Sequence, residues 1–301
     1  MGKLRYNIAL IVANVLFGAN FSFYVSLTKS TVSFQQIFIL QLTVAALLFI
    51  PVALLKKRTY KITLEDFGTI FIVALIVVYG WMYMLLWGAS QTNPIDASMI
   101  ATLGPVVTLI VAHIVNPQRP SWIKFLGAVL AIIGAMALLT DKNFHLLSNA
   151  TDAFGNALVL FAVIAIATNT VLINSTLRRY GELTIMGWFY IIGFVMAIPF
   201  FYNDLWSLFT TNLTLLSIAE LAYVTLLGTA LPMYLLYVGS AHLTAVHTAL
   251  YRYIQPLVAT TLALLRGQNI IDGATKVGAT LIFIGVVLVV AGNSLRKKVF
   301  K

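Results

Sequence analysis

The chain alternates between long apolar runs and short breaks that hold polar, charged, Gly or Pro residues. Each apolar run is about 17 to 25 residues long, the length that an α-helix needs to cross a hydrocarbon core of about 30 Å. The pattern predicts an all-α membrane protein, and its first run is too long for the apolar part of a signal peptide. We expect ten transmembrane helices near residues 6–28, 35–55, 66–87, 96–116, 122–140, 155–176, 184–203, 217–239, 246–266 and 277–293.

Composition supports a membrane location and excludes several chemistries. Of 301 residues, 60% are hydrophobic and 9% are charged, whereas soluble domains are roughly one quarter charged. Cys is absent, and the four His residues show no metal-ligand spacing, so we expect no disulfide, metal site or cofactor. No catalytic motif and no phosphate-binding Gly loop occurs. We therefore expect a protein that is not an enzyme and is not driven by nucleotide hydrolysis.

The distribution of charge predicts the orientation in the membrane. If the N-terminus is cytoplasmic, fourteen of the nineteen basic residues fall in inner segments and four in outer segments, while Arg252 falls within the ninth expected span. By the positive-inside rule, both termini are cytoplasmic. This asymmetry accounts for the net charge of +10 without nucleic acid as a partner. Short loops are typical of a protein of the bacterial inner (cell) membrane.

The chain contains an internal repeat. A shift of 151 residues aligns residues 82–134 with 233–285 without a gap, and a weaker match at a shift of 149 pairs Asn20 with Asn169. We expect residues 1–145 to form helices 1–5 and residues 150–301 to form helices 6–10. Because five is odd, the second half enters the membrane from the opposite side. Two inverted five-helix repeats around a central cavity are typical of alternating-access transporters.

Rare residue types keep one register in the two halves, and we interpret them as scaffold and hinge positions. Proline within a span frees a backbone carbonyl, and glycine lets helices approach closely. These positions are Pro105 and Pro256, Gly127 and Gly278, and Gly134 and Gly285.

The segments "YMLLWGASQTNPIDASMIATLGPVVTLIVAHIVNPQRPSWIKFLGAVLAIIGAMALL" and "MYLLYVGSAHLTAVHTALYRYIQPLVATTLALLRGQNIIDGATKVGATLIFIGVVLVVAG" resemble the paired EamA domains of the drug/metabolite transporter superfamily. The shared features are the small residues that end the third span, the Pro of the fourth, a polar turn and a Gly-rich fifth span. The resemblance implies ten helices around a cavity lined by spans 1, 3, 4, 6, 8 and 9. It also implies export of amino acids or other metabolites.

Arg252 is the leading candidate for substrate binding. A charge within a span costs about 2.5 to 3.5 kcal/mol on insertion scales, and all nine acidic residues fall in loops or near span ends. Its repeat mate is Ala101, so the shared scaffold does not require Arg. We hypothesise that Arg252 faces the cavity and pairs with a carboxylate or phosphate of the substrate. In the alternative, it snorkels to the inner interface or bonds carbonyls near Pro256.

Four further polar residues are also candidates for substrate binding. Thr248 and Gln255 share a helical face with Arg252. Asn20 and Asn169 either contact the substrate or bond between helices.

Tyrosines recur at helical spacing on the third and eighth spans, as Tyr79 and Tyr83 and as Tyr234 and Tyr237. They form either an aromatic cavity wall or the interfacial belt.

These features together predict a secondary or facilitative transporter for an amino acid or a related anionic or zwitterionic solute, acting in export. A multidrug exporter of lipophilic compounds is the alternative within the class, and a membrane enzyme or receptor is the alternative outside it. The expected partners are a small-molecule substrate and membrane lipid, with no nucleic acid and no obligate protein partner.

Overall fold

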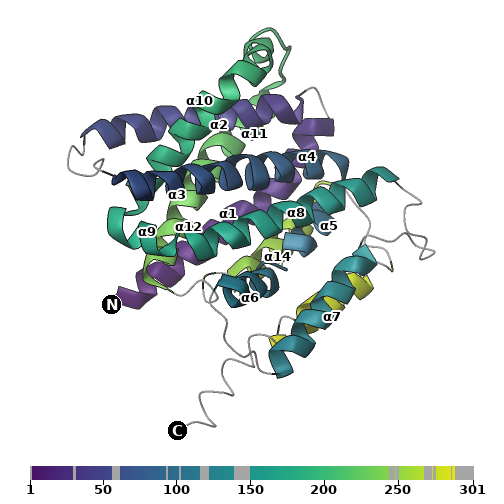
Figure 1. Cartoon of the computed structure of the whole chain (residues 1–301). Helices are drawn as coiled ribbons and strands as arrows, with labels where there is room; N and C mark the ends of the chain where they lie inside the picture. Colours follow the sequence, from purple (N-terminus) through teal and green to yellow (C-terminus); the bar gives the residue numbers. More distant parts are fainter. Residues whose placement is uncertain are drawn as a thin grey trace.

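The computed structural model describes residues 2–29, 32–55, 62–92, 94–101, 103–115, 122–138, 150–243, 248, 251–267, 273, 276–285 and 287–288. Throughout this part of the chain the regular structure is helical, with no strand. The helices form one bundle in which elements of the two halves lie beside one another (Figure 1).

The first half holds α1 (Gly2–Lys29), α2 (Phe34–Leu55), α3 (Leu64–Leu75), the π-helical η1 (Ile76–Tyr83), α4 (Met84–Gln91), α5 (Pro94–Ala101), α6 (Gly104–Val115) and α7 (Trp122–Leu138). The second half holds α8 (Ala150–Leu172), α9 (Asn174–Tyr180), α10 (Glu182–Leu208), α11 (Leu215–Ala222), the π-helical η2 (Tyr223–Ala230), α12 (Leu231–His242), the 3₁₀ turn η3 (Tyr251–Tyr253) and α14 (Ile254–Leu265). A shorter apolar helix covers Lys276–Gly285.

Seven helices among the described residues are long and apolar enough to cross a membrane. They cover the expected spans 1 to 4 and 6 to 8. The fifth and tenth expected spans contain the shorter apolar helices Phe125–Gly134 and Lys276–Gly285, and the ninth contains η3 and α14. The sequence-based prediction of an all-helical membrane fold is confirmed.

Polarity is distributed as in a membrane protein. Large apolar side chains cover the outside, and Phe200 and Leu215 are 78% and 84% exposed. Amide side chains lie inside, and Asn14 and Gln41 are fully buried. Lipid offers no hydrogen-bonding partner, so such groups are stable in a bilayer only against other protein groups.

Packing between the halves follows the sequence repeat. Helix α2 packs along α10, α4 packs along α8, and α1 contacts both α12 and α14. The pair α4 with α8 corresponds to the pair α12 with α1, because α12 is the repeat mate of α4 and α1 that of α8. The two halves thus make equivalent contacts with each other.

In the fourth and ninth expected spans, an α-helix begins next to the repeated proline. Helix α5 ends at Ala101 and α6 begins at Gly104, so Pro105 lies in the first turn of α6. In the second half, η3 precedes α14, which places Pro256 in the first turn of α14. Both prolines therefore lie in the first turn of an α-helix. Proline is tolerated at these first-turn positions because its missing N–H has no intrahelical acceptor there.

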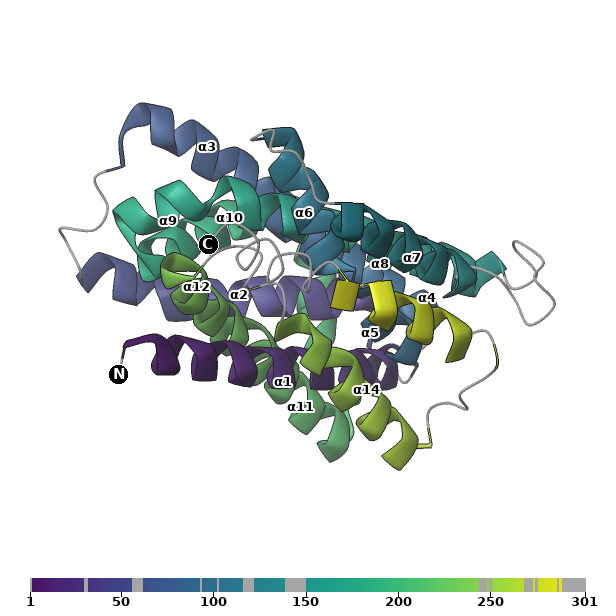
Figure 2. The same ribbon diagram turned by 90° about the horizontal axis from the view of Figure 1, so that it is seen from below.

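The four repeated glycines lie at one helix crossing. Helix α7 lies beside the helix Lys276–Gly285 (Figure 2). A Cβ atom built on Gly134 would lie 2.7 Å from the Gly278 carbonyl oxygen, and one on Gly285 would lie 2.5 Å from the Gly127 carbonyl oxygen. The contact is reciprocal, and each glycine lets the opposite backbone approach closely.

We predict that Gly134→Ala lowers the apparent melting temperature in detergent, at a cost of about 1 to 3 kcal/mol, because backbone must move to admit the methyl group. Gly68→Ala is the matched control, since a Cβ there meets no atom within 4 Å. An unchanged melting temperature for Gly134→Ala would contradict the tight crossing.

Candidate functional site

The bundle encloses a pocket with about 720 Å³ of empty space, its opening included. Its lining side chains come from α1, η1, α4, α5, α8, η2, α12, η3 and α14. These elements belong to the expected spans 1, 3, 4, 6, 8 and 9. A pocket with mostly apolar walls and few polar groups is typical of a small-molecule site.

Two π-helical stretches widen the backbone beside the pocket. Trp81 and Met82 of η1 and Gly228 and Thr229 of η2 are lining residues. The Thr229 hydroxyl donates to the Val224 carbonyl oxygen, five residues earlier, at 2.7 Å, which follows the π-helical spacing. Such stretches frequently occur at functional sites.

Aromatic rings form the middle of the pocket wall. Phe17 and Trp81 meet edge to face, with ring centroids 5.8 Å apart and planes at 88°. Phe21 of α1 and Ile166 of α8 also line this region. An apolar or aromatic part of a ligand fits such a surface.

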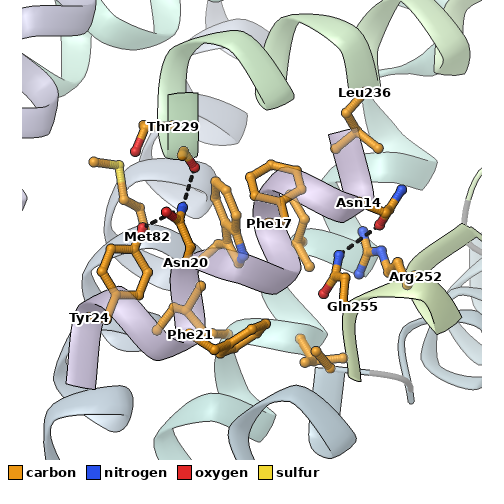
Figure 3. Close-up of a pocket in the computed structure, with 17 residues that line it drawn as sticks. Asn14, Phe17, Asn20, Phe21, Tyr24, Met82, Thr229, Leu236, Arg252 and Gln255 are labelled. Carbon is orange, nitrogen blue, oxygen red and sulfur yellow. Dashed lines mark hydrogen bonds between the residues drawn. The ribbon is translucent and has the colours of Figure 1, made fainter. Parts of the chain in front are cut away.

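One polar group of the pocket lies around Arg252 (Figure 3). The Gln255 Nε2 donates to Asn14 Oδ1 at 2.7 Å, which ties α14 to α1. Asn14 Nδ2 in turn donates to the Leu10 carbonyl oxygen at 2.7 Å. A Cβ atom on Gly104 would lie 2.7 Å from Arg252 Nη1 and 2.8 Å from its Cδ, so the absence of a side chain at Gly104 makes room for the arginine.

No acidic side chain among the described residues forms an ion pair with Arg252, which is 6% exposed. The two ion pairs in this part of the chain join Arg179 to Asp66 at 2.8 Å and Arg266 to Glu220 at 2.6 Å. The described pocket lining also contains no carboxylate. The pocket thus presents a buried cation without a fixed counter-ion from these residues.

A second polar group lies around Asn20. Its Nδ2 donates to the Tyr24 hydroxyl at 3.2 Å and to the Gly228 carbonyl oxygen, while its Oδ1 has no donor among the described residues. Gln41 Nε2 donates to the Tyr24 hydroxyl at 2.9 Å and to the Thr229 hydroxyl at 2.6 Å. Figure 3 shows Phe17 between this group and Arg252.

Several lining residues are repeat mates of one another. Leu85 and Leu236 both line the pocket and are related by the shift of 151, as are Ala101 and Arg252. Asn14 and its mate Val163, related by the shift of 149, also both line it. The pocket therefore lies where the two halves meet, and its polar groups occur at positions where the halves differ.

The predicted site residues divide into two sets. Arg252, Gln255 and Asn20 line the pocket, whereas six do not: Tyr79, Tyr83, Tyr234, Tyr237, Asn169 and Thr248.

Most residues of the second set pack among helices. Tyr83 contacts the ring of Phe38, with centroids 5.0 Å apart, and Tyr79 and Tyr234 are partly buried against the same core. Asn169 Nδ2 donates to the Tyr237 hydroxyl at 3.3 Å, the interhelical bond that was the alternative for Asn169.

Thr248 is 1% exposed, and its hydroxyl has no hydrogen-bond partner among the described residues.

Sequence reasoning missed Asn14, Tyr24, Thr229 and Gly104. Asn14 carried a usable signal, because it is an amide within the first apolar run, six residues before Asn20. Nothing in the sequence pointed to Gly104, because its role depends on where the Arg252 side chain packs.

An apolar helical bundle with an internal pocket between its two halves defines an integral membrane protein. The profile of the EamA-like transporter family matches residues 4–140 and again residues 153–291. The chain belongs to the EamA-like transporter family, which confirms the resemblance stated above.

Curated relatives are also named as transporters. The chain is 22% identical to an uncharacterized transporter of Clostridium kluyveri over 86% of this chain and 84% of that protein. It is 25% identical to the biotin transporter of Escherichia coli K12 over 63% of this chain and 61% of that protein. These names indicate a transporter rather than an enzyme.

A solved crystal structure shares the fold. It covers 95% of this chain and 96% of its own, with a TM-score of 0.66 and 14% sequence identity.

We predict that the bond between Asn14 and Gln255 couples α1 to α14 energetically. Asn14→Leu and Gln255→Met each leave a buried amide without its partner and lower thermal stability, by about 1 to 3 kcal/mol. The double variant is expected to lose about 1 kcal/mol less than the sum of the single losses.

Thr168→Val and Thr261→Val provide the control pair, because these exposed hydroxyls bond only within their own helices. The loss of stability in the double control variant should equal the sum of the two single losses. Strict additivity for Asn14 and Gln255 would argue against the coupling.

Proposed function

We propose that this protein is a secondary or facilitative transporter that moves a small anionic or zwitterionic metabolite, such as an amino acid, out of the cell by alternating access. The observation that carries the proposal is the Arg252 cation, which lines the pocket without an acidic partner among the described residues. A guanidinium in a low-dielectric pocket favours a carboxylate or phosphate, with which it forms charge-assisted hydrogen bonds.

The repeat supports the alternating-access part of the proposal. We interpret the chain as ten helices in two inverted repeats, and the reciprocal contacts of Gly134 and Gly285 suit that arrangement. Two related halves supply two nearly equivalent conformations when they exchange roles. The charge asymmetry supports cytoplasmic termini, and the short loops favour a bacterial inner membrane.

The named relatives are compatible with an anionic solute. Biotin, the substrate in the name of the Escherichia coli relative, carries a carboxylate. A lipophilic cation would be repelled by Arg252, which disfavours a multidrug exporter even though the walls are aromatic.

The first test is a thermal-shift panel of metabolites on purified wild type beside Arg252→Gln and Arg252→Lys, because a ligand that binds the folded state raises its apparent stability. We expect amino acids or other organic acids to stabilise the wild type. The glutamine variant should not respond, and the lysine variant should respond weakly, since Lys lacks the planar fork of donors.

Flux of the stabilising solute in liposomes then tests transport. An equal response of wild type and variants, or stabilisation by lipophilic cations alone, would contradict the proposal and favour the multidrug exporter.

Gly104 offers a second test that leaves the charge in place. Gly104→Ala should displace the Arg252 guanidinium and weaken binding of the stabilising acid about tenfold, the equivalent of one hydrogen bond to a charged group. Gly80→Ala is the control, because its Cβ would lie 3.1 Å from the Ala165 side chain and away from the arginine. Unchanged affinity in Gly104→Ala would show that the Gly104 contact does not set the position of the guanidinium.

A further inference from the structure

The two polar groups of the pocket are too far apart for one compact solute. Asn14, beside Arg252, and Asn20 are six residues apart on α1, which corresponds to about 9 Å along the helix axis. The rings of Phe17 and Trp81 line the wall as well, and Figure 3 shows Phe17 between the two groups. The ammonium and carboxylate of an α-amino acid are attached to one carbon atom, so they cannot reach both groups.

The group around Arg252 offers donors. The guanidinium carries only donors, and the Gln255 and Asn14 amides are oriented by their mutual bond. This end of the pocket suits a carboxylate.

The group around Asn20 offers an acceptor. Asn20 is 3% exposed, and its Oδ1 lies buried without a donor among the described residues. The Tyr24 hydroxyl accepts from Asn20 Nδ2 and from Gln41 Nε2, and it also interacts with the Thr229 hydroxyl, so its partners are protein groups. The N–H of an amide or urea group complements the Asn20 oxygen.

We propose that the solute is an elongated organic acid with its carboxylate on Arg252, an apolar middle against the aromatic wall, and an amide-type or urea-type group at Asn20. This inference rests on the proposed function, because it assumes that Arg252 binds the solute's anion. It narrows the solute from anionic and zwitterionic metabolites in general to acids with a second polar group at the far end of the chain.

Three small acids test the proposal by calorimetric titration of the full chain in lipid nanodiscs. Pimelic acid monoamide carries a carboxylate and a terminal amide, heptanoate has the same chain with a methyl end, and norleucine is a compact zwitterion. We expect the monoamide to bind about tenfold more tightly than heptanoate, which corresponds to one or two net hydrogen bonds. Norleucine should bind more weakly than the monoamide.

Variants assign that preference to the second polar group. Asn20→Ser should lower the ratio of monoamide affinity to heptanoate affinity from about ten to about one. Tyr24→Phe should lower this ratio as well, because it removes the hydroxyl that holds Asn20 Nδ2. Tyr79→Phe is the matched control and should retain the preference, because its hydroxyl reaches the Gly193 carbonyl oxygen outside the pocket. If Asn20→Ser proves too unstable, Tyr24→Phe carries the test, because Gln41 keeps its bond to Thr229.

The outcomes separate this inference from the proposed function. Equal affinity for monoamide and heptanoate, with both lost in Arg252→Gln, would overturn the elongated solute and leave the anion carrier intact. Tighter binding of norleucine would also overturn it and favour an amino acid. If no acid binds in a manner that depends on Arg252, both proposals fail together.

Discussion

Lipid provides no hydrogen-bonding partner, and the rest of this structure depends on that constraint. A buried amide without a partner costs free energy, and a buried charge costs more. The chain meets this constraint by turning its amides inward and against one another, as Gln41 does with Tyr24 and Thr229. The same inward arrangement creates a pocket whose few polar atoms have fixed directions. The side chains that satisfy one another's hydrogen bonds in the bundle therefore also give the pocket its polar atoms.

Close helix approach is the second requirement, because apolar helices gain little from the hydrophobic effect inside lipid and associate through packing. Glycine allows that approach where α7 crosses the helix Lys276–Gly285. It also does so at Gly88, where a Cβ would lie 2.7 Å from the Gly155 carbonyl oxygen. In a membrane, small residues at helix crossings allow the close packing that large apolar residues provide in a soluble core. This requirement accounts for glycine at matching positions in both halves.

The helical fold was largely predictable from sequence, because the length of each apolar run and the register of the repeat can be read directly from the order of residues. The α-helix starts beside Pro105 and Pro256 were not predictable, since proline within a helical pattern is compatible with either a kink or a helix start. For the pocket, Arg252 and Asn20 stood out as polar residues in apolar runs. Tyrosine gave a poorer signal, because Tyr83 and Tyr237 pack in the core as readily as they would line a cavity. Which ring faces the pocket depends on helix rotation, and periodicity alone does not fix that rotation.

The repeat also separates packing positions from the positions that make the pocket polar. Positions that match in both halves, such as Gly134 and Gly285, hold the helices at equivalent distances. Positions that differ, such as Ala101 and Arg252, give the pocket its polar groups. Gln255 and its mate Gly104 differ in the same way, and the bare Gly104 accommodates the arginine supplied by the other half. A duplicated scaffold can therefore change the polarity of its pocket through substitutions at unmatched positions, while the matched positions keep the helix packing.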